Sequence, residues 1–363
     1  MNIKIFLFLH IDKHSKKIVI MKLLVPGVLI LILFACKPSA VENLEIIAGE
    51  NDTTLFMEPF GMCSDSEGNL YITDAGHHQV KKVTPGGVIT IFAGTGHPGN
   101  TDGPAGSASF NYPSGICTDG EGNFYIAGFG GQNIRKISSD GNVSTIAGTG
   151  EEGYRDGAGA EALFSSPRGI CIDSHGNLFV GDCWNHRIRK ITPGGVVSTF
   201  AGGGARGELV VNDWRDGSDT LSRFDAPCGM AIDNEDNIYV ADANNNCIRK
   251  ISPGGIVTTL AGIAGRRESK DGKYGESVLN CPTELVVSDD GTIYFSDTYG
   301  NQVKKITGEL EVVTVAGTGE PGKLNGEPIN STLASPRGIT VSGDYLFFIE
   351  YSNRMVRRLK LKQ

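Results

Sequence analysis

A unit of 54 to 60 residues repeats six times along this chain, and this repetition constrains the fold more than any other feature of the sequence. Each unit opens with a proline, and in five of the six units a glycine follows two residues later. Glu284 takes the place of that glycine in the remaining unit. The prolines are Pro59, Pro113, Pro167, Pro227, Pro282 and Pro336. A fixed period of this length is typical of repeat architectures, in which every copy forms one structural element.

Each unit contains four strand patterns separated by turn signals. In residues 167–202 the patterns are ICID, LFVGD, RIRKIT and VVSTFAG, which are rich in side chains that favour pleated surfaces. The last unit lacks its fourth strand, but a matching pattern, LEIIAG at residues 44–49, precedes the first proline. Closing the units into a ring removes exposed sheet edges. The sequence therefore predicts an all-β fold over residues 44–363, a six-bladed β-propeller whose ring is closed by an N-terminal strand that completes the last blade.

The unit resembles the NHL repeat. Residues 182–190, DCWNHRIRK, match the signature D-x-x-N-H-R-I-R-K of that repeat at nearly every place. The glycine-rich loops after the fourth strands are similar to those of the teneurin-like branch of NHL propellers. The resemblance covers the chain from about Val41 onward and implies the propeller fold, an architecture that hosts many different activities.

The start of the chain follows a different pattern. Residues 23–34 form an apolar run preceded by Met21-Lys22, with a length typical of a signal-peptide core and too short for a membrane span. The run ends in LFAC, which resembles a bacterial lipoprotein box and implies cleavage before Cys36 and a lipid on its sulfur. The alternative is an ordinary secretory signal with an incidental cysteine. We expect a signal peptide at residues 1–36 with its true start at Met21, a tether at 37–43, and a lipid-anchored protein of the bacterial cell envelope exposed outside the cytoplasm.

Several charged residues recur once per unit and have structural interpretations. An aspartate such as Asp182 ends the second strand, and we expect it to bond the amides of its own hairpin. An aspartate such as Asp156 lies in four of the crossovers, with Asn325 in its place in the last, and one carboxylate per loop is too few for calcium, so a loop-shaping cap is expected. Basic pairs such as Arg189-Lys190 should lay their stems on apolar strands, with their heads in water or beside carboxylates. The formal net charge of −8 argues against nucleic acid as a partner.

Among the cysteines of the repeats, Cys63, Cys117 and Cys171 occupy equivalent first-strand positions and are expected in the core. Cys183 and Cys228 are expected at adjacent strand ends on one face. A disulfide between them is the alternative in an oxidising envelope, and free thiols are favoured.

No cofactor or metal is indicated by the motifs. G-x-G-x-x-G occurs four times, but each copy follows the last strand of a unit and does not open a helix, as dinucleotide binding requires. Some propeller lyases of the resembled family hold zinc with several histidines, and such chemistry needs about three protein ligands. Here no three histidines share an inner position. The expectation leans against an enzyme, and a metal-dependent lyase or hydrolase is kept as the alternative.

Turns and crossovers of a propeller meet on one face around the central channel, and here they carry aromatic and arginine side chains typical of binding sites. The candidate ligand-binding residues are Phe129, Arg168, Trp184, Trp214, Tyr299, Arg337 and Tyr351. Trp184 and Trp214 are expected to form an aromatic shelf with Arg168 beside it, suited to a sugar ring, a peptide aromatic or a carboxylate. The alternative is that these aromatics only pack the loops. We expect a monomeric module that binds a protein, peptide or glycan on this face, with a purely structural scaffold as a further alternative.

Overall fold

A computed structural model describes the chain apart from residues 1–3, 10–17, 26–27, 36–42, 50–51, 53, 204–213 and 362–363. The chain divides into two units, Met1–Asn43 and Leu44–Gln363. In the first unit, three antiparallel strands pair in the order β1 (Lys4–Leu9), β2 (Ile18–Val25) and β3 (Val28–Ala35). The signal peptide expected in this segment stays a prediction, and Cys36 lies outside the described residues. No helix among the residues that the structure describes is long and apolar enough to cross a membrane.

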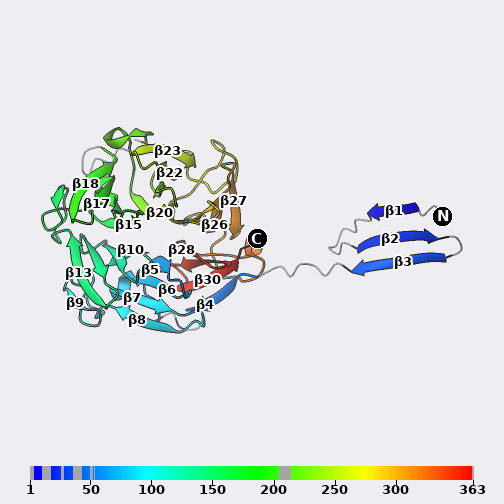
Figure 1. Ribbon diagram of the computed structural model, residues 1–363, viewed down its shortest axis with the longest axis horizontal. Helices are drawn as coiled ribbons and strands as arrows, with labels where there is room; N and C mark the ends of the chain where they lie inside the picture. The colour runs from blue at the N-terminus through cyan, green and yellow to red at the C-terminus, as the bar shows by residue number, and fades with distance from the viewer. Residues whose placement is uncertain are drawn as a thin grey trace. The chain divides into compact units, whose positions relative to one another are not determined.

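The second unit is a ring of six antiparallel sheets, the predicted six-bladed β-propeller (Figure 1). Blades one and two contain β5 (Pro59–Ser64), β6 (Leu70–Asp74), β7 (Gln79–Val83), β8 (Ile89–Ala93), and β10 (Pro113–Thr118), β11 (Phe124–Gly128), β12 (Asn133–Ile137), β13 (Asn142–Ala147). Blades three and four contain β15 (Pro167–Ile172), β16 (Leu178–Asp182), β17 (Arg187–Ile191), β18 (Val196–Ala201), and β20 (Pro227–Ile232), β21 (Ile238–Asp242), β22 (Cys247–Ile251), β23 (Ile256–Ala261). Blades five and six contain β24 (Pro282–Val287), β25 (Ile293–Asp297), β26 (Gln302–Ile306), β27 (Val312–Ala316), and β28 (Pro336–Ser342), β29 (Tyr345–Glu350), β30 (Met355–Lys360), β4 (Glu45–Ala48).

Short elements complete the described part of this unit. Two-residue strands from the crossovers extend the outer edges of blades two, three and four: β9 (Gly103–Pro104), β14 (Gly157–Ala158) and β19 (Gly217–Ser218). Single 3₁₀ turns occur at η1 (Ala75–His77), η2 (Cys183–Asn185), η3 (Asp219–Leu221) and η4 (Pro328–Asn330). The described residues contain no α-helix.

The ring closes as predicted. Strand β4 pairs antiparallel with β30, with Val356 opposite Ala48 and Arg358 opposite Glu45. The first strands of the blades, β5, β10, β15, β20, β24 and β28, each contact the first strands of two neighbours, so they surround the centre of the ring. The N-terminal strand therefore supplies hydrogen bonds that the last blade would otherwise lack, and the outer edge of β30 is covered.

The core lies between neighbouring blades. One cluster joins Tyr71 and Val80 of blade one to Ile116 and Ile126 of blade two, and similar clusters join the other blades. Cys63, Cys117 and Cys171 pack in these clusters as free thiols, as predicted. Each sheet thus buries both faces against its two neighbours, which is why the second strands are almost continuously apolar.

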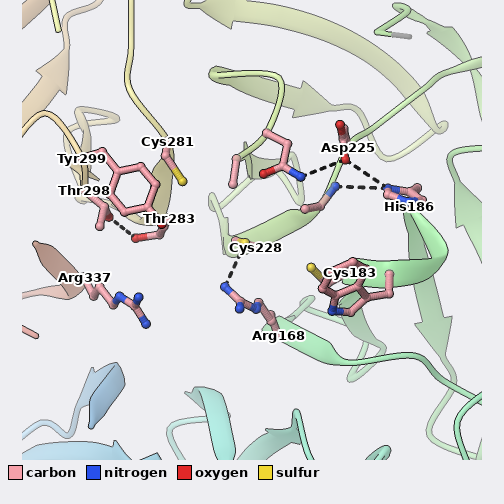
Figure 2. A pocket seen from close by; sticks show the side chains of 14 residues that line it. Arg168, Cys183, His186, Asp225, Cys228, Cys281, Thr283, Thr298, Tyr299 and Arg337 are labelled. Atoms are coloured by element: carbon pink, nitrogen blue, oxygen red, sulfur yellow. Dashed lines mark hydrogen bonds and ion pairs between the residues drawn. The ribbon is translucent and has the colours of Figure 1, made fainter. Parts of the chain in front are cut away.

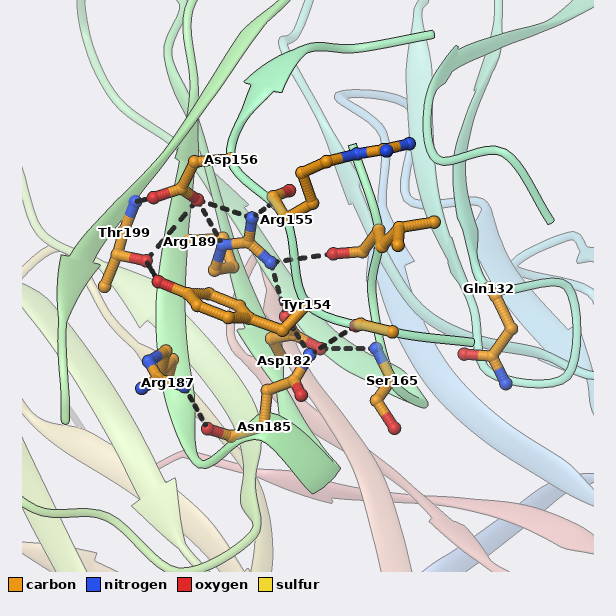
Figure 3. Close-up of polar contacts among 12 residues, drawn as sticks. Gln132, Tyr154, Arg155, Asp156, Ser165, Asp182, Asn185, Arg187, Arg189 and Thr199 are labelled. Carbon is orange, nitrogen blue, oxygen red and sulfur yellow. Dashed lines mark hydrogen bonds and ion pairs between the residues drawn. The ribbon is translucent and has the colours of Figure 1, made fainter. Parts of the chain in front are cut away.

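The recurring aspartates bond more than was predicted. Oδ2 of Asp182 accepts a hydrogen bond at 2.9 Å from the side-chain amide of Asn185 in its own hairpin, as expected, but its other bonds reach beyond the hairpin. Asp182 Oδ1 accepts a hydrogen bond from the Ser165 amide at 2.8 Å, which belongs to the segment entering the blade and not to the hairpin of Asp182 (Figure 3). Asp182 Oδ2 lies 2.6 Å from Nη1 of Arg189, and Asp156 Oδ1 lies 2.6 Å from Nη2 of the same guanidinium. Asp156 also accepts the Thr199 amide at 3.0 Å, so it ties the crossover to the outer strand instead of capping its own loop.

Each basic pair places its two members in different surroundings. The first member is buried inside the blade and ion-paired, as in Arg189 and Arg249, so its head does not reach water. The second member lies over an aromatic ring of the second strand, as in Lys190, whose Nζ is 5.6 Å from the centre of the Phe179 ring. The predicted contact with carboxylates is found for the first members, which face the blade interior because alternate residues of a strand face opposite sides of the sheet. It is also found for one second member, Arg358, whose Nε lies 2.7 Å from Oε2 of Glu45.

Candidate functional site

One side chain from each blade converges at the centre of the ring. These are the residues that directly follow the blade prolines: Phe60, Ser114, Arg168, Cys228, Thr283 and Arg337. The glycine after this position allows neighbouring first strands to approach closely. A Cβ atom added at Gly169 would lie 2.0 Å from the carbonyl oxygen of Cys228, and one at Gly115 would lie 2.2 Å from that of Arg168. The proline-x-glycine pattern therefore lets neighbouring first strands pack closely around the centre of the ring.

A cavity of about 410 Å³ opens beside this ring (Figure 2). Four of the residues that directly follow blade prolines line it: Arg168, Cys228, Thr283 and Arg337. Its walls come from the turns between second and third strands and from the segments that precede blade prolines: Cys183, Trp184, His186, Asp225, Ala226, Ala243, Asn244, Cys281, Thr298 and Tyr299. The volume suits a small molecule or one to two residues of a larger ligand.

Two arginines that have no ion-pair partner in the described structure line the cavity, together with one carboxylate, that of Asp225. The guanidinium of Arg168 lies 5.2 Å from the ring centre of Phe60 and 4.9 Å from that of Phe129. The guanidinium of Arg337 lies 4.6 Å from the Phe60 centre and 3.8 Å from that of Tyr351. Within the described residues neither forms an ion pair, and Nε of each is buried without a hydrogen-bond partner. Burial and the neighbouring Arg168 both lower the pKa of Arg337, so an anion placed between them would relieve a repulsion.

Most of the predicted ligand-binding residues come together. Arg168, Trp184, Tyr299 and Arg337 line the cavity. Phe129 stacks on Arg168 and Tyr351 stacks on Arg337. Of the predicted residues, this leaves Trp214. The exposed fractions are 54% for Trp184 and 64% for Tyr299, so both present a free aromatic face to solvent. Their binding role stays a prediction.

Trp214 is not brought to this cavity. It precedes β19 in the crossover to blade four, is 44% exposed, and does not line the cavity. The expected aromatic shelf of Trp184 and Trp214 is therefore not part of this site. Sequence reasoning missed Phe60 and Cys228, although their place directly after a blade proline, shared with Arg168, is a signal that could have identified them.

Glu284 places a carboxyl group where other blades have glycine. It is the third residue of β24, only 9% exposed, and its Oε1 is buried without a hydrogen-bond partner in the described structure. Burial raises the pKa of Glu284 to about 8, and the nearby arginines only partly offset this effect. The group is therefore largely neutral at physiological pH, which leaves the positive charge of Arg168 and Arg337 uncompensated.

The histidines of the turns have structural partners. Nδ1 of His78 accepts a hydrogen bond from the Tyr112 amide at 3.1 Å, and Nδ1 of His186 accepts one from the Ala226 amide at 3.3 Å. Each links the turn of one blade to the start of the next. Across the described residues, no group of three or more His, Cys, Asp or Glu side chains is arranged to hold a metal ion.

Comparison with known proteins identifies the repeat. The family model described as NHL repeat matches residues 56–83, 164–191 and 224–251. The chain is 26% identical to Protein SUPPRESSOR OF QUENCHING 1, chloroplastic, of Arabidopsis thaliana, over 81% of this chain and 29% of that protein. It is 25% identical to human NHL repeat-containing protein 2 over 81% of this chain and 45% of that protein, and 25% identical to Danio rerio Teneurin-3 over 74% and 10%. The chain thus spans less than half the length of these relatives.

Solved structures share the fold at low sequence identity. An auxiliary nutrient binding protein from Bacteroides thetaiotaomicron aligns with a TM-score of 0.67 and 12% identity, covering 94% of this chain and 82% of that one. Virginiamycin B lyase from Staphylococcus aureus aligns with a TM-score of 0.55 and 16% identity, covering 88% and 99%. At these identities the similarity shows the architecture alone.

Proposed function

We propose that this chain, which carries NHL repeats and closes them into a six-bladed β-propeller, is a binding module. It captures an anionic group of a peptide, protein or glycan in the cavity beside the ring centre. The observation that carries the proposal is the pair Arg168 and Arg337, which have no carboxylate partner among the described residues and both lie near the ring of Phe60. Both side chains are only partly exposed, and cations withdrawn from water are normally paired, so this pair favours the binding of an anion.

The surroundings of the arginines favour recognition over a structural role. Phe60, Phe129 and Tyr351 hold the two guanidinium planes by stacking, which reduces the side-chain entropy lost when a ligand binds. A carboxylate can accept two parallel hydrogen bonds from a guanidinium, and such charge-assisted pairs are stronger than neutral ones. Exposed Trp184 and Tyr299 add flat apolar faces at the rim for a sugar ring or a peptide side chain.

The setting of the module is proposed from the sequence and the similar structures. The lipoprotein-like start of the chain supports a propeller tethered through Cys36 on the outside of a bacterial membrane. We propose that it acts there as a monomer. The nutrient-binding protein of similar fold supports capture of an external ligand. The alternative, a metal-dependent lyase or hydrolase, finds support in the lyase of similar fold. It requires a ligand set that the described residues do not gather.

Calorimetric titration with defined probes tests the proposal. The probes are oligogalacturonides and short peptides with free C-terminal carboxylates, each compared with its neutral methyl ester or amide. We expect the charged forms to bind and the neutral forms to bind at least about tenfold more weakly, since a hydrogen bond to a charged group contributes about 1.5–3 kcal/mol. Arg337→Gln should remove this preference. Equal binding of charged and neutral probes would contradict the proposal.

A matched pair of tryptophan variants locates the site. Trp184→Ala should weaken binding about tenfold or more, the effect of a central aromatic anchor worth about 2 kcal/mol. Trp214→Ala removes an equally large exposed side chain that does not line the cavity and should leave affinity unchanged. The reverse result would place the site at the crossover. Unfolding of Trp184→Ala, measured by thermal melting, would instead make Trp184 a packing residue.

A further inference from the structure

Three cysteines from three blades gather on one wall of the cavity. Cys183 lies in the turn after β16, Cys228 is the second residue of β20, and Cys281 directly precedes β24. Cys183 and Cys228 are 4% and 2% exposed and pack in one cluster with Cys281 beside them. All three line the cavity and are free thiols (Figure 2). A small molecule in the cavity therefore meets a wall of sulfur atoms.

Arg168 distinguishes one of these thiols from the others. Its Nη1 donates a hydrogen bond to Sγ of Cys228 at 3.5 Å, and Figure 2 shows the side chain extending from β15 to that sulfur. Stacking on Phe60 and Phe129 fixes the guanidinium in this position. Because no carboxylate in the described structure neutralises Arg168, its full charge acts on the sulfur. A cation beside a cysteine favours the thiolate, which is the nucleophilic form.

Electrostatics set Cys228 apart from every other described cysteine. The hydrogen bond with Cys183 and the charge of Arg168 lower the pKa of Cys228 in spite of burial. The same hydrogen bond and burial raise the pKa of Cys183, and burial raises the pKa of Cys281. Burial raises the pKa of all the remaining described cysteines: Cys63, Cys117, Cys171 and Cys247.

The other groups that face Cys228 act in both directions. Arg337 adds a second positive charge that favours the thiolate. Glu284 interacts with Cys228 and would oppose the thiolate only when it is ionised. Cys183 and Cys281 are protonated when Cys228 is charged, so neither competes for the arginines.

We propose that Cys228 is a reactive thiol that exchanges with a small disulfide entering the cavity, with Cys183 as the resolving thiol. This activity goes beyond ligand capture and does not depend on it, although both use the same cavity. The contact between Cys183 and Cys228 places the resolving sulfur beside the attacking one. Cys281 stays reduced in this scheme.

The exchange proceeds in two balanced steps. The Cys228 thiolate attacks one sulfur of a disulfide R–S–S–R, the S–S bond breaks, R–S⁻ leaves, and a mixed disulfide Cys228–S–S–R forms. Cys183 then loses its proton to the departed thiolate and attacks the Cys228 sulfur, which expels the second R–S⁻. The second R–S⁻ takes from solvent the proton that Cys228 released when it formed its thiolate. The two cysteines together therefore lose two electrons and two protons, and R–S–S–R gains them as two R–SH.

A neutral dipyridyl disulfide at about pH 5.5 tests the proposal, because ordinary thiols are almost wholly protonated there. Each unit by which a thiol pKa is lowered raises its thiolate fraction about tenfold at this pH and costs about threefold in nucleophilicity, a net gain of about threefold. We expect one thiol of the full chain to react about thirtyfold faster than an ordinary thiol, which corresponds to a pKa of about 6 for Cys228. Peptide mass spectrometry of the early product should identify Cys228, followed by release of two equivalents of pyridinethione.

Variants separate the two roles. Cys183→Ser should release one equivalent and keep a stable mixed disulfide on Cys228, and Arg168→Gln should slow the first step about threefold or more. Cys247→Ser is the matched control, since Cys247 is a 1% exposed cysteine that does not line the cavity, and it should leave the fast phase unchanged. Mapping the label on the unmodified chain avoids dependence on the folding of any variant.

The proposal is overturned by a fast label on any other cysteine, by the lack of a fast thiol, or by two equivalents released from Cys183→Ser. Failure of the charged probes to bind while Cys228 still reacts would refute only the ligand-binding function. Binding of those probes with an unreactive Cys228 would refute only the exchange activity.

Discussion

The buried carboxyl group of Glu284 should make the propeller less stable as the pH rises, and Glu284→Gln should remove this effect. The carboxyl lies against a neighbouring first strand, because a Cβ atom added at Gly229 would be 2.7 Å from Glu284 Oε2. No described side chain satisfies its Oε1. Glutamine has nearly the same shape but does not titrate, so the substitution isolates the cost of charging this position.

The sign and size follow from the pKa. The usual value for glutamate is 4.5, and burial raises that of Glu284 to about 8 in the folded protein. Between these values the unfolded chain releases the proton while the folded chain retains it, so stability is fully present below about pH 4.5 and is lost as pH approaches 8. The loss is at most about 1.4 kcal/mol per pH unit, or about 4 kcal/mol from pH 5 to pH 8.

Urea unfolding of the wild type and of Glu284→Gln at several values between about pH 5 and pH 8 measures this difference. The two proteins should be similarly stable near pH 5, and the variant should be more stable by about 2–4 kcal/mol near pH 8. The charge of Cys228 interacts with Glu284, so the same comparison in a Cys228→Ser background isolates the carboxyl group. Glu121→Gln, at an exposed position in a turn, should track the wild type throughout. Parallel curves for wild type and Glu284→Gln would refute the argument.

The remaining predictions concern closure, the blade interior and the anchor. Deleting residues 44–49 should lower the melting temperature or cause aggregation, since β30 loses its partner; melting like the wild type would show that closure does not depend on this strand. Arg189→Met should cost about 3–5 kcal/mol because Asp182 keeps a buried charge without its cation, whereas Lys190→Met should cost less than about 1 kcal/mol; equal losses in urea unfolding would contradict this account. Cys36→Ser should move the protein from the membrane to the soluble fraction of cells, and retention after alkaline washing would argue against a lipid anchor.

The fold could be predicted from the sequence because it depends on local patterns and their spacing. The proline period gives the number of blades, and the strand pattern at residues 44–49 identifies the closing strand. Both predictions rest only on the hydrogen bonding of neighbouring strands and on the free-energy cost of leaving a sheet edge unpaired. Part of the cavity lining could also be predicted from the sequence, since Arg168 and Arg337 share a position relative to the blade prolines.

The partners of the charged side chains could not be predicted in this way. The spacing between Asp182 and Arg189 is visible in the chain, but their ion pair is completed by the Ser165 amide and by Asp156, which approach from the crossover (Figure 3). A recurring aspartate satisfies a turn-forming pattern equally well whether it caps its own hairpin or binds an incoming segment. Only the packing of the crossover against the blade decides between them.

The site itself was decided by closure of the ring. Arg168 belongs to blade three and reaches Phe60 of blade one because the intervening blade presents only the small side chain of Ser114. The sequence carries the identities of these residues, but not the tilt and curvature that determine which side chains meet across the centre. The same is true of Trp214. The sequence suggested that it lies beside Trp184, but in the folded chain it does not line the cavity. Contacts between residues one or more blades apart depend on the shape of the whole ring, and that shape exists only in the tertiary structure.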